Sequence, residues 1–146
     1  MIPKHYRIHV VLMVSVLVML VYPMITAKPD KDKERLATEA ANRFLQRIDA
    51  GEYGPGWDDA ASLLKKRIPR EQWVVNLAQS RERTGAPVER VKAKAIYSPM
   101  AQDSPEGEYI VITYKTAFAR QNQLNETVTV MLDRDARWRI AGYFVQ

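Results

Sequence analysis

The stretch that decides the fold is ETVTVMLD at residues 126–133, followed by RDA at 134–136 and RWRIAGYFVQ at 137–146. Apolar side chains alternate with polar or small ones from Val128 to Leu132, and again from Trp138 to Phe144. A period of two predicts a strand with one buried face, and two such runs around a polar turn predict a β-hairpin. Strict alternation places Val128, Val130, Leu132, Ile140 and Phe144 on the buried face.

The segments before the hairpin extend it and cover it. Period-two patterns predict two more strands, at about residues 88–97 and 109–119. Before Pro87 the apolar spacing changes to three and four, which is typical of amphipathic helices. This spacing predicts three helices, over about residues 36–50, 57–67 and 70–84. Helices followed by strands with short turns indicate an α+β fold, in which three N-terminal helices pack on a four-stranded antiparallel meander.

The N-terminal residues have the layout of a secretory signal. Lys4 and Arg7 precede an apolar run over residues 10–25, and small residues end it at Ala27. This predicts a signal peptide over residues 1–27, with an uncleaved membrane anchor as the alternative. We therefore expect a periplasmic or secreted body, or an inner-membrane-anchored one outside the cytoplasm. Residues 28–35 are predicted to be a charged spacer, and residues 36–146 a single α+β domain.

Composition excludes several function classes. The chain has no cysteine, and both histidines, His5 and His9, lie in the predicted signal. The body therefore has neither Ser-His-Asp nor Cys-His catalysis, and no ordinary zinc or copper site. We predict no metal, no cofactor and no catalytic residue. The net charge of +5 is spread along the chain, which argues against a nucleic-acid partner.

Short segments in a fixed order carry a resemblance to a known family. They are IDAGEY at 48–53, EGEY at 106–109, ETV at 126–128 and WRIAGYF at 138–144, with Trp57, Trp73, Arg81, Gly85, Tyr114, Thr116 and Phe118 between them. In this order they resemble the bacterial domain of unknown function 4019 family, over roughly residues 37–144. Gly56 and the Asp135-Ala136 turn depart from the family pattern. The resemblance implies an exported protein, cystatin-like or similar to the nuclear-transport-factor-two superfamily, and implies no known activity.

One carboxylate is predicted to point inward. Glu126 shares the parity of the buried residues of its strand, and Arg81 falls on the apolar side of its helix. We expect these two side chains to meet at the edge of the core, either as a structural ion pair or in a pocket. The candidate pocket residues are Trp73, Arg81, Tyr114, Glu126 and Trp138. A small-molecule-binding or enzymatic cone built on them is the alternative function.

The opposite face of the sheet is predicted to be unusually apolar. Its candidate interface residues are Tyr109, Val111, Met131, Tyr143 and Val145. A solvated face should be more polar, so this patch indicates a homodimer or docking of an envelope protein partner. The alternative is an ordinary outer face, since scattered apolar residues are common on protein surfaces. The leading prediction is therefore a non-enzymatic interaction or binding module of the cell envelope, with membrane contact only through an uncleaved N-terminus.

Overall fold

The helices come first in the chain and the strands last. The computed structural model describes residues 29–100 and 104–146, so the predicted signal or anchor of residues 1–27 lies outside the described part. The elements are α2 (Lys31–Asp49), α3 (Tyr53–Asp58), α4 (Ser62–Arg67), α5 (Arg70–Thr84), β1 (Pro87–Ser98), β2 (Tyr109–Phe118), β3 (Leu124–Leu132) and β4 (Trp138–Val145). The strands form one antiparallel sheet in the order β1-β2-β3-β4, which confirms the predicted α+β meander.

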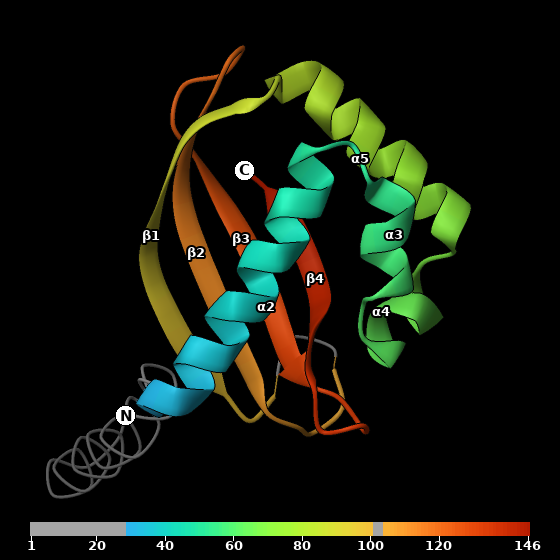
Figure 1. Ribbon diagram of the computed structural model, residues 1–146, viewed down its shortest axis with the longest axis vertical. Helices are drawn as coiled ribbons and strands as arrows, with labels where there is room; N and C mark the ends of the chain where they lie inside the picture. The colour runs from blue at the N-terminus through green and yellow to red at the C-terminus, as the bar shows by residue number, and fades with distance from the viewer. Residues whose placement is uncertain (1–28, 101–103) are drawn as a thin grey trace, which may run out of the picture.

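The helices cover one face of the sheet and one of its edges. Helix α2 crosses in front of the sheet and contacts β2, β3 and β4, while α3, α4 and α5 gather beside β4 (Figure 1). No helix within residues 29–100 or 104–146 is long and apolar enough to span a bilayer.

Helix α2 forms where its apolar spacing predicts a helix. Its start is earlier than residue 36, because the Asp30 side chain accepts hydrogen bonds from the backbone N–H groups of Asp32 and Lys33 and caps the first turn. Phe44 and Ile48 belong to the buried stripe that packs on the sheet. The helix ends before Gly51, whose φ of +79° suits a residue without a side chain.

The predicted helix over residues 57–67 is two short helices. Helix α3 begins at Tyr53, because Pro55 falls in its first turn, where a missing N–H costs nothing. The helix breaks after Asp58, and the backbone N–H of Ala61 donates to the carbonyl oxygen of Ile140 on β4, at 2.8 Å. Tertiary hydrogen bonding to the edge strand therefore replaces helical continuity at this point.

Strand β4 contains a bulge that the period-two pattern does not predict. Thr129 pairs with Gly142, but the next residue of β3, Val130, pairs with Ile140. Ala141 is thus an extra residue in β4. A bulge of one residue reverses which face every later side chain occupies.

The bulge changes the predicted faces of the last three residues of β4. Tyr143 lies opposite Val128 and Val145 lies opposite Glu126, so both share the helix-facing side of the sheet. Phe144 takes the outer side, where it is 50 % exposed. The prediction that Phe144 faces the helices, with Tyr143 and Val145 outward, is therefore wrong.

Candidate functional site

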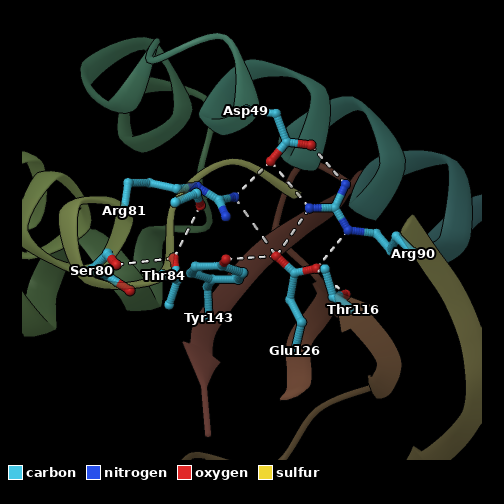
Figure 2. Close-up of polar contacts among 9 residues, drawn as sticks. Asp49, Ser80, Arg81, Thr84, Arg90, Thr116, Glu126 and Tyr143 are labelled. Carbon is cyan, nitrogen blue, oxygen red and sulfur yellow. Dashed lines mark hydrogen bonds and ion pairs between the residues drawn. The ribbon is translucent and has the colours of Figure 1, made fainter. Parts of the chain in front are cut away.

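The buried carboxylate of Glu126 is fully hydrogen-bonded. Its side chain, on β3, is 0 % exposed. Arg90 of β1 donates to both carboxylate oxygens, with nitrogen–oxygen distances of 2.5 and 3.1 Å (Figure 2). Thr116 of β2 and Tyr143 of β4 donate their hydroxyl hydrogens to it, over 2.8 and 2.7 Å. Four donors from three strands therefore hold the carboxylate in place.

A second carboxylate completes the cluster from the helix side. Asp49, the last residue of α2, accepts from Arg90 at 2.7 and 3.1 Å and from Arg81 of α5 at 2.6 Å. The guanidinium of Arg81 lies 3.8 Å from Glu126. Two carboxylates and two guanidinium groups thus alternate in space with no net charge (Figure 2). We call these four residues, with Thr116 and Tyr143, the buried network after Glu126 at its centre; the Asp49 side chain at its rim is 24 % exposed.

These contacts shift the pKa values of Glu126 and Tyr143. Burial by itself would raise the pKa of Glu126, but the hydrogen bonds from Arg90, Tyr143 and Thr116 and the charge of Arg90 outweigh it and lower that pKa. Burial raises the pKa of the Tyr143 hydroxyl, and the neighbouring Glu126 charge adds to the effect. Glu126 is therefore ionised with its oxygens already engaged, which suits a structural anchor and not a general base near pH 7.

The predicted pocket residues are divided among different environments. Arg81 and Glu126 approach each other as expected, within the buried network. The indole N–H of Trp73 donates to the Tyr53 carbonyl oxygen at 3.1 Å, and Trp73 lines a groove beside β4. Trp138 lines a separate cleft near α2.

Tyr114 also has a structural hydrogen bond. Its hydroxyl donates to the Asn42 side-chain oxygen at 3.3 Å, and burial raises the pKa of Tyr114 to about 12. The five predicted pocket residues therefore do not line one cavity.

Arg90, the main partner of Glu126, was not among the predicted site residues. The available signal was a single arginine at an inward position of the first strand, opposite Thr116. Two register shifts in the pairing of β1 with β2 obscure that position, because each shift changes the parity of the strand.

The predicted interface residues do not form one outer patch. Tyr109 is 0 % exposed, and its hydroxyl donates to the Pro105 carbonyl oxygen at 2.9 Å. It packs with Ala61 and Ala141, and Met131 lies partly buried against them. Val111 is half-buried, and the bulge turns Tyr143 and Val145 to the other side. One end of the outer face is therefore covered by the chain itself.

A large cleft lies along the outer edge of β4. It has a volume of 520 Å³ and runs between residues 141–145 and the wall formed by α4 and α5. The polar side chains on that wall include Arg67, Asn76, Ser80 and Arg83, and no acidic residue is among the described residues that line the cleft. We call it the β4 groove.

The backbone of β4 offers hydrogen-bonding groups to this groove. Asn125 and Gln146 exchange two backbone hydrogen bonds, at 2.8 and 2.9 Å. Bonded and non-bonded pairs alternate along an antiparallel ladder, so Val145 and Tyr143 direct their N–H and C=O groups away from β3. Within the described residues, no backbone group pairs with them on that side. The groove therefore exposes part of a sheet edge.

The described residues contain no group of three or more His, Cys, Asp or Glu side chains placed to hold a metal ion. The fold and its clefts define a small α+β domain with a partly buried ionic cluster and an open edge groove. The family described as "Protein of unknown function (DUF4019)" matches residues 40–143, and the chain belongs to this family. No curated protein and no solved structure matches the chain.

Proposed function

We propose that this protein is an exported binding module of the cell envelope, without catalytic activity, which holds an extended segment of a partner protein in the β4 groove. The observation that carries the proposal is the open backbone edge of Tyr143 and Val145 inside that groove. An extended peptide that adds to a sheet edge gains main-chain hydrogen bonds whatever its sequence, and the surrounding side chains supply specificity.

The dimensions of the groove suit a single short strand. A residue in a strand occupies about 3.3 Å of length, about 4.8 Å of sheet width and about 10 Å of thickness, or roughly 160 Å³. A volume of 520 Å³ therefore accommodates about three residues. A groove of this volume between β4 and the wall of α4 and α5 suits a short segment better than the sheet of a second folded copy, which favours a peptide over a homodimer.

The charge of the groove indicates an acidic segment. Arg83 lies on its wall, and no carboxylate is among the described residues that line the groove. Arginine forks bind carboxylates through paired hydrogen bonds. A segment with Asp or Glu beside apolar residues would complement both Arg83 and the apolar side chains of Trp73 and Leu77.

The other edge of the sheet supports the choice of β4. Strand β1 has register shifts at Pro87/Glu89 and at Lys92/Lys94. Bulges and lysines are the devices by which natural sheets discourage pairing at an edge. The chain therefore protects one edge and leaves part of the other available within a groove.

The test is selection from a random hexapeptide display library against the folded domain. We expect enrichment of extended, acidic peptides and, in NMR titrations with a selected peptide, the largest amide shifts at Tyr143 and Val145. Val145→Pro removes an N–H that β3 does not use, and we expect it to weaken binding about tenfold or more, through one lost hydrogen bond and the ring itself. Val145→Ala keeps the N–H and is the matched control.

Two outcomes would overturn the proposal. One is the absence of peptide enrichment over a blank surface. The other is a selected peptide that binds Val145→Pro as tightly as wild type and shifts amides elsewhere. The amide shifts of the wild-type protein keep the test decisive even if the proline variant folds poorly.

A further inference from the structure

A second, smaller cleft collects four arginines. It has a volume of 110 Å³ and lies between α2, the end of α3 and the start of β4. Arg43 and Arg47 come from α2, Arg137 immediately precedes β4, and Arg139 lies near the start of β4. We call this cleft the arginine pocket. Phe44, Trp138 and Ile140 contribute apolar surface beside the four guanidinium groups.

Two of the four arginines are paired with carboxylates. Arg47 lies 3.0 Å from Asp59, which is the acidic residue among the described residues that line the pocket. Arg139 lies 2.6 Å from Asp135 in the turn before β4, and it also donates to the backbone oxygen of Asp59 at 3.1 Å. These contacts position both guanidinium groups at the pocket.

The other two arginines form no ion pair within the described part of the chain, although the charge of Arg137 acts on Asp135 nearby. Neither the Arg43 nor the Arg137 guanidinium forms a hydrogen bond or ion pair with any residue in 29–100 or 104–146. Both side chains are exposed, so neither is needed to satisfy the interior. Like charges repel, and apolar walls strengthen the field within a concave site. The pocket therefore has an excess of positive charge that an anion would neutralise.

We propose that the arginine pocket binds a single phosphoryl group, as free phosphate or as the phosphate of a lipid headgroup. Guanidinium forks match the oxygens of a phosphate through paired hydrogen bonds, and several forks around one cavity can engage several oxygens. The pocket holds the equivalent of about four waters at about 30 Å³ each, which is the size of one tetrahedral oxyanion. Because Arg43 and Arg137 are exposed, the pocket opens to solvent on their side, which leaves room for a substituent on the bound phosphoryl group.

The experiment measures binding of inorganic phosphate to the full chain by NMR and calorimetry at fixed ionic strength, with acetate as the competing anion. We expect phosphate to shift the side-chain signals of the four arginines. Arg43→Gln combined with Arg137→Gln should weaken phosphate binding about tenfold or more, because charge-assisted hydrogen bonds are lost. Lys66→Gln combined with Lys94→Gln removes the same charge from exposed positions outside the pocket and should leave binding unchanged.

A second arm distinguishes the source of the phosphoryl group. Phosphatidylglycerol vesicles that bind the chain and displace phosphate, with no response to phosphatidylcholine, indicate a headgroup. Phosphate binding without vesicle binding indicates a soluble phosphate or phosphoester. No phosphate binding, equal binding by the Arg43/Arg137 variant, or acetate binding as tight as phosphate would each overturn the proposal.

Discussion

The buried network and the arginine pocket both gather arginines from distant parts of the chain, and they differ in charge balance. In the buried network, Arg81 and Arg90 alternate with Asp49 and Glu126 over distances of 2.5 to 3.8 Å. In the arginine pocket, two of the four arginines form no ion pair within the described residues. A balanced, buried cluster fixes helices to a sheet, whereas an unbalanced, exposed cluster has capacity for a ligand. This difference predicts opposite responses to mutation.

Removal of the buried carboxylate should have the largest effect. Glu126→Gln leaves Arg90 partly buried with one carboxylate partner instead of two, and the loss of one partner from a buried pair costs about 3–5 kcal/mol. We expect a fall of about 3 kcal/mol in the free energy of unfolding, measured by urea denaturation at pH 7. The double variant Glu126→Gln/Arg90→Met removes both charges and should recover part of this loss. A loss below about 1 kcal/mol in the single variant would mean that the network is not the anchor described here.

Acid should weaken the same network. The charged or titratable groups that face Glu126 are Asp49 of α2, Arg81 of α5, Arg90 of β1 and Tyr143 of β4. The pKa of Glu126 is lower in the folded chain than in the unfolded one, so its stabilisation is complete above the unfolded value of about 4.3. It is lost as the pH falls through the folded pKa.

Unfolding curves from pH 7 to pH 3 test this dependence. The difference in unfolding free energy between wild type and Glu126→Gln should be constant near neutral pH and should shrink below about pH 4. A difference that stays constant down to pH 3 would show that the Glu126 charge is not the source of the stabilisation.

The smallest effect on stability is expected in the arginine pocket. Arg43→Gln combined with Arg137→Gln removes two exposed charges that form no ion pair in the described structure. The free energy of unfolding should change by no more than about 0.5 kcal/mol, with a slight gain at low salt as repulsion falls. A loss of several kcal/mol, measured by the same denaturation, would place these arginines with the buried network as structural residues.

The last hairpin shows both the strength and the limit of a repeating pattern. Residues 126–132 and 138–145 alternate as strands do, and the structure has strands there. The polar residues between them predict a turn, but Ala136 adopts a φ of +58°, which local preference disfavours for alanine, with its N–H bonded to the Asp133 carbonyl oxygen at 2.9 Å. The bulge at Ala141 leaves no clear signal in the alternation, because it depends on how β4 fits against β3 and Ala61.

The candidate sites show a similar division. Parity within a single strand and spacing within a single helix are enough to place Glu126 and Arg81 inward, and the two side chains do approach each other. Arg90 can be identified as the main partner of Glu126 only from the register of β1 against β2, which includes two shifts. The β4 groove can be recognised only from the position of α4 and α5 beside β4, a strand that is distant from them in sequence.

The sequence by itself determined the element types and their order, the α+β class and the inward carboxylate, because these follow from periodicity and polarity over a few neighbouring residues. Only the tertiary structure decided which arginine meets Glu126, which residues of β4 face the helices, and where the two clefts lie. These features depend on strand register and on packing between distant segments, and a shift of one residue changes them without disturbing the local pattern.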